Sequence, residues 1–534
     1  MQISIWPRFR AGILLICLAA TCGIAHADGD PRLVVVIAVD QLRNDRLTAE
    51  LPGGLGRLLR GGRRFVDSSV DHGLTTTCPG HAVLTTGVHP GRAGIPGNRY
   101  VDRADWRNRY CVDDDDDAYR VIGGSANRSP GLLRASDLGD WLRAAHPEAK
   151  VFSVGGKDRS AIMMGGRKPD GVFWFEPDLL AFTSSGYYAE ALPGYVAAFN
   201  AGLKERLPLQ WHHGPGSVRP DDFPGESTTN RRTSGHPVAA GKHPGRQIQQ
   251  SPFVDDATFD LAQQLITGER LGNGAGPDLL TIALAALDTV GHLYGPLSAE
   301  AEDTLQRLDA RLAVFLDELD TRFGADNYLV ALSADHGVTD LPEWSLHQGT
   351  NRCPVAGSRL SYASLVTRVY GRIYWRHTFP FDAPTSLMRI ADSQVYVNAN
   401  YLRDRDMNPT EVLASLKQIF ESTPGVKAAW TLDEVATGTD EAARLLRNSV
   451  VPGRSGDLFI QLHPDCMIGS TGTTHGSLYP PDRSVPLLFY GSGVVPGADA
   501  TPARSVDLAP TVAHHIGIAA PRDLDGAALP LTAR

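Results

Sequence analysis

Long apolar runs alternate with amphipathic stretches along much of the chain. Residues 33–39 (LVVVIAV) form a continuous, mostly β-branched run, which is typical of a strand buried on both faces of a parallel sheet. Similar apolar runs occupy 279–287 and 327–334. Three other stretches have the apolar spacing of helices: 255–267, 298–320 and 505–517, the last with Ser505 as its expected N-cap. This alternation predicts an α/β fold on a mostly parallel central sheet flanked by helices.

An acidic residue stands at the end of each expected strand. Asp40 follows the first run, Asp288 follows the second, and Asp335 follows the third with His336 directly after it. In α/β sheets, ligands bind outside the carboxyl ends of the parallel strands. We therefore expect these acidic residues to face one rim of the sheet.

Two stretches depart from the alternation. Residues 214–252 are polar and rich in Pro, Gly and Ser, which indicates a long surface excursion rather than a domain. Residues 340–470 have elements of their own: expected strands at 394–398, 426–430 and 457–461, and a helix opened by Asn408 and Pro409. We expect them to form a small α+β cap inserted into a catalytic α/β domain that comprises 28–339 and 471–534.

The first 27 residues have the pattern of a secretory signal. Arg8 and Arg10 precede the apolar stretch AGILLICLAA, and residues 25–27 (AHA) supply the small residues of a cleavage site before Asp28. No later run reaches 18 apolar residues, so we expect no stable membrane insertion and a periplasmic or secreted mature protein. Four cysteines would remain after cleavage, with three possible disulfide pairings: Cys78, Cys111, Cys353 and Cys466.

Composition narrows the classes of partner. The 534 residues are 42% apolar and 21% charged, as in a globular protein with a large core. The formal net charge is −9 and there is no basic block, which argues against nucleic acid as a partner. The acidic run 113–117 lacks the glycine and the ligand spacing of a calcium loop, and a solvated turn is favoured.

The segment TTTCPGHAVLTTG (75–87) holds the candidate nucleophile. Pro79 suits the first position of a helix, which would leave Thr77 just before the helix start, where free backbone N–H groups favour an anion. Thr77 could present its hydroxyl to a phosphate, or could serve only as a helix N-cap. Cys78 is a rival nucleophile, although in an exported protein a disulfide is the favoured state.

Three aspartates and three histidines could together hold metal ions. The imidazoles are His292, four residues after Asp288, His336, and His475 in the segment GTTHGS. Each residue alone is a weak signal. As a set, their nitrogen and oxygen ligands suffice for two Zn²⁺ ions with coordination positions left open. Two such ions roughly 4 Å apart can clamp the attacking and leaving oxygens of an in-line displacement.

From about residue 31 to 534 the sequence resembles the phosphodiesterase and nucleotide-pyrophosphatase branch of the alkaline phosphatase superfamily, especially its threonine-nucleophile alkaline phosphatases. The motif T-x-P-x-H corresponds to residues 77–81, and a phosphate-contacting asparagine to Asn98. A K-D-R motif that marks the monoesterase members corresponds to Lys157 and Arg159 on either side of Asp158. The departure from the family pattern is Cys78.

The resemblance also implies two Zn²⁺ ions per chain and assigns their ligands. One set is Asp288, His292 and His475. The other is Asp40, Asp335 and His336, together with the nucleophile Thr77. It further implies a covalent phosphothreonine intermediate and broad specificity for small-molecule phosphate monoesters.

Lys157 and Arg159 bear on the choice of ester. A monoester has one more free, charged oxygen than a diester, and two cations with the Asn98 amide can satisfy it. The main alternative is a phosphodiesterase or nucleotide pyrophosphatase with the same metals. A second alternative, from another class, is a non-catalytic exported metal-binding module. The sequence leaves the natural substrate and the oligomeric state open.

Overall fold

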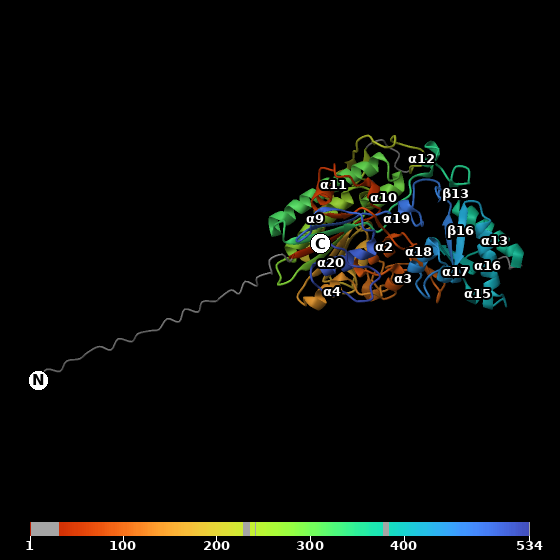
Figure 1. The fold of residues 1–534 in the computed structure, drawn as a ribbon, viewed down its shortest axis with the longest axis horizontal. Coiled ribbons are helices and arrows are strands. Elements are labelled where there is room, and N and C mark those ends of the chain that lie inside the picture. The colour runs from red at the N-terminus through yellow and green to blue at the C-terminus, as the bar shows by residue number, and fades with distance from the viewer. Residues whose placement is uncertain (2–30, 228–234, 241, 378–383, 533–534) are drawn as a thin grey trace.

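The computed structural model describes residue 1 and residues 31–227, 235–240, 242–377 and 384–532. The signal segment predicted at 1–27 lies, apart from Met1, outside the described residues. A larger α/β body carries a smaller lobe on one side. Figure 1 shows the helices of the lobe grouped together: α13 (Tyr362–His377), α15 (Ala399–Arg403) and α16 (Pro409–Glu421). No helix in the described ranges is long and apolar enough to span a membrane.

A nine-stranded sheet forms the centre of the body. Its five central neighbours are parallel and follow in the order β12 (Tyr328–Ser333), β1 (Leu33–Val39), β11 (Asp278–Leu284), β6 (Val151–Gly155) and β7 (Gly171–Glu176). Short strands extend the two edges. Beyond β12, β19 (Leu487–Gly491) pairs antiparallel with β12, β2 (Arg63–Phe65) antiparallel with β19, and β20 (Gly497–Asp499) parallel with β2; beyond β7, β8 (Ala181–Thr183) pairs antiparallel with β7. The prediction of a mostly parallel central sheet is confirmed.

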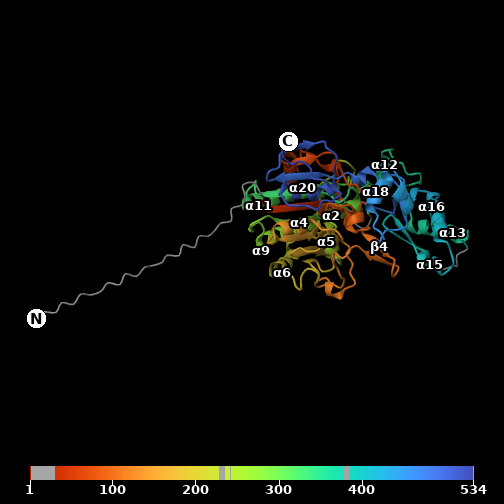
Figure 2. The same cartoon turned by 60° about the horizontal axis from the view of Figure 1, so that its bottom comes forward.

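Helices cover both faces of this sheet, which explains why β1 is apolar at every position. Alternate residues of β1, beginning with Leu33, share one core with α9 (Phe253–Gly268) and α11 (Ala299–Phe323). The intervening residues, beginning with Val34, share a second core with α4 (Leu138–Ala145) and α20 (Leu508–His515). Figure 2 shows α4 and α20 close together on this side. Side chains on successive strand residues point to opposite faces, so both sets must be apolar.

Three boundaries differ from the sequence-based expectation. The apolar run expected as a strand over 279–287 is a strand only to Leu284, and a helix, α10 (Ala286–Tyr294), begins two residues later. Helix α2 (Thr77–Thr86) includes Thr77 as its first residue, so Pro79 is third. Ser505 begins a 3₁₀ turn before α20 and is not its N-cap.

The smaller lobe has its own four-stranded antiparallel sheet. Its strands follow in the order β14 (Met388–Ala391), β15 (Gln394–Val397), β17 (Leu458–Leu462) and β16 (Val426–Thr431). Helix α16 covers the sheet, with the Asn408 side chain accepting a hydrogen bond from the Thr410 N–H as its N-cap. The strands and the helix expected in this stretch are thus present.

Residues 96–103 of the body are joined to the lobe by several bonds. The Gln394 side chain donates to the Pro96 carbonyl at 2.7 Å, and the Arg103 guanidinium pairs with Asp457 at 3.0 Å. Asp392, in the turn between β14 and β15, accepts a hydrogen bond from the Asn98 N–H at 2.8 Å. The lobe is therefore fixed to the segment that carries Asn98.

The four described cysteines form two disulfides, Cys78–Cys111 and Cys353–Cys466. The acidic run 113–117 is a turn whose carboxylates bond nearby arginine and serine side chains. The stretch 214–252, expected as an excursion, includes the short strand β10 (His236–Pro237), which pairs with β9 (Gln210–Trp211), and helix α8 (Pro244–Gln249).

Candidate active site at the carboxyl ends of the strands

The central parallel strands bring the predicted residues to one rim. Asp40 follows β1 directly, Asp335 and His336 follow β12, and Lys157 follows β6. Asp288 and His292 lie one turn apart on α10, the helix that follows β11, so their side chains share a helix face. His475 comes from the long loop that precedes β19, and Thr77 from the N-terminus of α2.

Asp288, His292 and His475 form one potential metal-binding set. Their ligand atoms all lie within 4.8 Å of one another. Asp288 Oδ1 is 3.1 Å from His292 Nε2 and 3.5 Å from His475 Nε2. The other ring nitrogen, Nδ1, is hydrogen-bonded to a backbone carbonyl in both histidines. His292 Nδ1 lies 2.8 Å from the Thr473 carbonyl oxygen, and His475 Nδ1 lies 2.7 Å from that of Thr75. Such second hydrogen bonds hold the ring so that Nε2 faces the site.

Asp40, Asp335 and His336 form the second set, and all three are fully buried. His336 Nε2 is 3.2 Å from Asp335 Oδ2 and 3.5 Å from Asp40 Oδ1. These three atoms have no hydrogen-bond partner among the described residues. Buried polar atoms are normally satisfied. Unpartnered carboxylate oxygens and an imidazole nitrogen at these distances fit a divalent cation with mixed N and O ligands.

The two sets form one continuous site. Asp40, Asp288 and His336 also lie within mutual ligand distance, and the His336 and His475 rings stack with centroids 3.6 Å apart. Lys157 Nζ donates to Asp40 Oδ2 at 2.6 Å and also to Asp288, so one ammonium links the two sets.

The shifted pKa values of Asp335, Asp40 and His475 reflect the negative charge that is concentrated at this site. Burial and then the Asp40 charge raise the pKa of Asp335 to about 6. Burial and then Asp288 oppose ionisation of Asp40, but Lys157 and neighbouring histidines hold the pKa of Asp40 below its ordinary value. Burial disfavours the charged form of His475, yet its hydrogen bond to Asp288 raises the pKa of His475 to about 9. The carboxylates thus depend on nearby positive charge.

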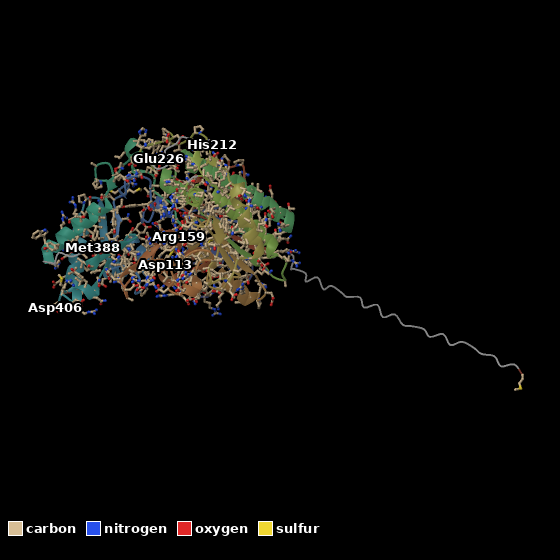
Figure 3. The ribbon with its side chains drawn as sticks, turned by 180° about the vertical axis from the view of Figure 1, so that it is seen from behind. Asp113, Arg159, His212, Glu226, Met388 and Asp406 are labelled. Atoms are coloured by element: carbon tan, nitrogen blue, oxygen red, sulfur yellow. A yellow bond between two sulfur atoms is a disulfide. The ribbon has the colours of Figure 1, made fainter. Side chains whose placement is uncertain are left out.

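Thr77 lies beside this site at the start of α2. Arg159 Nη2 is 3.4 Å from Thr77 Oγ1. Asn98 Oδ1 accepts a hydrogen bond from the Cys78 N–H at 2.7 Å, so the side chain of Asn98 lies against the same helix terminus. Figure 3 shows Arg159 near the middle of the molecule, with Asp113 of the acidic turn close by in that view. The structure therefore brings together every residue selected from the sequence.

Several supporting residues were not selected from the sequence. Gln41 has a left-handed backbone (φ 72°), its N–H bonds Asp335 at 3.1 Å, and its side chain bonds Asp288 at 2.9 Å. His81 lies 3.1 Å from Asp335 Oδ2. Gln41 could have been noticed because it directly follows Asp40, and His81 because it belongs to the T-x-P-x-H motif.

A second group of supporting residues orients Arg159. Tyr110 OH accepts from Arg159 at 3.2 Å and donates to Asp158 at 2.6 Å, and Arg128 bonds Asp158 at 2.8 Å. Asp158 could have been noticed as the centre of the K-D-R motif. Nothing in the sequence links Tyr110 or Arg128 to it.

A cavity of about 420 Å³ opens beside the site, between the body and the lobe. Asn98, His292 and His475 line it from the body. The lobe contributes Ile390, Asp392 and Ile460. The cavity can therefore take a small organic group next to the potential metal ligands.

Comparison with known proteins places these features in context. Residues 34–479 match the type I phosphodiesterase / nucleotide pyrophosphatase family. The alkaline phosphatase PhoK of Sphingomonas sp is 32% identical over 531 residues, 94% of this chain and 91% of PhoK. A Myroides odoratus protein named calcium-transporting ATPase is 30% identical over 522 residues, 92% of each chain.

A solved structure is also similar. Alkaline phosphatase PafA, whose Elizabethkingia meningoseptica sequence is 29% identical over 553 residues and covers 96% of each chain, has a crystal structure with a TM-score of 0.84. That comparison gives 28% identity and covers 94% of this chain and 99% of the PafA chain. The expected alkaline-phosphatase-like fold is confirmed.

Proposed function

Because the chain belongs to the type I phosphodiesterase / nucleotide pyrophosphatase family, we propose that it is a metal-dependent phosphoric ester hydrolase that prefers phosphate monoesters. The family and the alkaline phosphatases among its relatives support the ester hydrolase. The observation that carries the proposal is the convergence of Thr77, Arg159 and Lys157 on two adjoining sets of N and O ligands.

We assign two divalent ions, preferably Zn²⁺, to these sets. Asp288, His292 and His475 would hold one ion, and Asp40, Asp335, His336 and Thr77 the other. When bound, such ions lower the pKa of a hydroxyl group and neutralise the charge of a phosphoryl group. The unpartnered buried atoms of Asp40, Asp335 and His336 support this assignment.

Thr77 is the proposed nucleophile. Its oxygen forms a bond to phosphorus while the bond between phosphorus and the leaving oxygen breaks, which yields an alcohol and a phosphothreonine. Water then attacks phosphorus, and the products are inorganic phosphate and free Thr77. The start of α2 suits this role, since the dipole of the helix favours an anion at this end.

Lys157 and Arg159 are proposed to select the monoester. An ammonium has three N–H donors, and Asp40 and Asp288 accept two of those of Lys157. A third donor remains for a phosphoryl oxygen, and the guanidinium of Arg159 lies beside the nucleophile. A diester has an organic group in place of one such oxygen, so it benefits less from these cations.

The test compares a nitrophenyl phosphate monoester with a bis-nitrophenyl diester. Lys157→Ala and Arg159→Ala should each lower kcat/KM for the monoester by roughly 10²–10³, the usual range for losing one donor to developing charge, with a much smaller change for the diester. Lys168→Ala removes an exposed cation just beyond the C-terminal end of α5 (Asp158–Gly165), the helix that contains Arg159 and follows Lys157, and is the matched control. Equal losses on both substrates would favour the phosphodiesterase alternative.

We further propose that the protein is exported to the periplasm or secreted after cleavage near Ala27. The signal-like segment 1–27 and the two disulfides support this, because disulfides persist in oxidising compartments. Substrates are expected to be small phosphate monoesters. We expect broad specificity, because the cavity has a volume of about 420 Å³ and is lined by residues of both the body and the lobe.

A further inference from the structure

A second group of potential metal ligands lies away from the proposed active site. It comprises His213, His236 and Glu300. His213 follows β9, His236 begins β10, and Glu300 lies in the first turn of α11. Their side chains are 0%, 4% and 2% exposed. The three residues therefore join the paired strands β9 and β10 to α11 at a buried point.

The ligand atoms form a nearly equilateral triangle. His236 Nε2 is 3.3 Å from His213 Nε2 and 3.2 Å from Glu300 Oε1, and His213 Nε2 is 3.7 Å from the same oxygen. Ligands bound about 2.0–2.1 Å from a tetrahedral zinc ion lie roughly 3.3–3.4 Å from one another. The triangle has nearly these dimensions.

The proton inventory also favours a cation at this point. His213 Nδ1 is 2.8 Å from the Gly214 carbonyl, which can only accept, so the neutral ring carries its proton there. The lone pair of His213 Nε2 then faces an imidazole nitrogen and a carboxylate oxygen. Moreover, Glu300 Oε2 and the nearby Asp221 Oδ2 are buried without a hydrogen-bond partner.

Neighbouring positive charge does not compensate. The Asp221 carboxylate lies within electrostatic reach of both Glu300 and His213. The nearby guanidinium of Arg219 is engaged by Glu226, Asp340 and the Tyr294 carbonyl. Tyr294 OH lies 3.3 Å from His236 Nδ1, so the triangle itself offers at most the N–H of His236 Nε2 to two acceptors, His213 Nε2 and Glu300 Oε1.

We propose that His213, His236 and Glu300 bind a further divalent ion of the zinc type, with Asp221 or water as the fourth ligand. The site is structural, because its ligands are buried and it connects the paired strands β9 and β10 to α11. This inference does not rest on the proposed function, since none of its ligands belongs to the active site.

Residues 213–227, which begin at this proposed site, reach the active site through backbone contacts. The Ser227 N–H bonds the Leu293 carbonyl at 2.8 Å, next to His292. The Gly472 N–H bonds the Gly225 carbonyl at 2.6 Å, and the carbonyl of the next residue, Thr473, orients His292. The proposed ion would thus stabilise a neighbour of one catalytic ligand set.

The first test uses the unmodified protein. In zinc-saturated crystals, anomalous difference maps recorded above and below the zinc absorption edge should show a peak among the three ligand atoms. Anomalous difference maps without a peak among these three ligand atoms would overturn the proposal. They would indicate that the three side chains share a proton and bind no ion. Peaks at the two catalytic sets report separately on the proposed function.

The second test counts metal in solution. The double variant His213→Gln and His236→Gln should contain one equivalent of zinc fewer per chain than His212→Gln, the matched control on an exposed neighbour. It should also unfold at a lower temperature. The difference of one equivalent holds whatever the active site contains. Equal zinc contents in a folded double variant would refute the site, and the crystal experiment decides if the double variant does not fold.

Discussion

Backbone carbonyl groups orient the three imidazoles of the active site. Nδ1 of His292, His336 and His475 lies 2.7–2.9 Å from a carbonyl oxygen in each case. A ring that donates from Nδ1 presents the lone pair of Nε2 on its other side, in the form that binds a metal. The sequence predicts which histidines matter, but every residue has a carbonyl, so it does not predict which one holds each ring.

The central prediction at this scale concerns Thr77. Thr77→Ala removes the proposed nucleophile and should lower monoester hydrolysis by about 10³-fold or more, whereas Thr77→Ser keeps a hydroxyl and should retain most of the activity. Acid quenching during turnover of ³²P-labelled substrate should trap labelled protein with Thr77 or Ser, but not with Ala.

Two controls make that result specific. The Thr77→Ala variant should still bind at least the zinc ion assigned to Asp288, His292 and His475. Wild-type protein treated with a chelator should lose activity and regain it when Zn²⁺ is added back. Full activity of Thr77→Ala would point to another nucleophile, and Cys78 is unsuited because it forms a disulfide with Cys111.

Among the elements, helix α10 is positioned by a carboxylate from another helix. Asp255 of α9 accepts hydrogen bonds from the N–H groups of Ala285 at 2.7 Å and Ala286 at 3.1 Å, where α10 begins. These are the groups that a helix start leaves without partners. Asp255 thus fixes the helix that carries Asp288 and His292.

Replacing Asp255 should separate its hydrogen bonds from its charge. Asp255→Ala removes both bonds and should lower the free energy of unfolding by about 1–2 kcal/mol. Burial raises the pKa of Asp255 to about 7. Between pH 4 and pH 7 the unfolded chain therefore releases a proton that the folded protein keeps, which lowers stability as the pH rises.

Asp255→Asn keeps an acceptor and does not titrate. Its stability relative to wild type should therefore increase from pH 4 to pH 7, as measured by urea unfolding at each pH. A constant difference between Asp255→Asn and wild type would contradict the raised pKa.

The misplaced element boundaries have physical causes. A short apolar run does not distinguish a buried strand from the buried start of a helix, so the strand end at Leu284 was not visible in 279–287. The first turn of a helix has free N–H groups, and it therefore tolerates Pro79 at its third position as well as at its first. In contrast, the uninterrupted apolar run 33–39 predicted β1 correctly, because burial on both faces demands apolar side chains at every position.

For the molecule as a whole, the disulfides and the N-terminal segment make a joint prediction. All four described cysteines are paired, and the other two, Cys17 and Cys22, lie in the expected signal. Protein recovered from an exporting host should begin at Asp28 and contain no free thiol after unfolding. N-terminal sequencing and thiol titration in denaturant check this, and two free thiols per chain would mean that the segment is retained.

The contacts between the body and the lobe could not be predicted from the sequence. The hydrogen bond from Asn98 to Asp392 joins residues 294 positions apart, and each residue type is common in turns. The sequence did predict the elements of the lobe from their local patterns. It did not predict which surfaces meet, because that depends on the packing of whole elements.

The bond between Asp392 and Asn98 has an evolutionary consequence. The segment 96–103 and the turn before β15 hold each other, and Asn98 also meets the start of α2 through Cys78. In a chimera that received only the lobe of a relative, the backbone N–H of Asn98 would lose its hydrogen bond to Asp392. Chimeras that alter specificity should therefore exchange both pieces together, and we expect natural lineages to have inherited them as one unit.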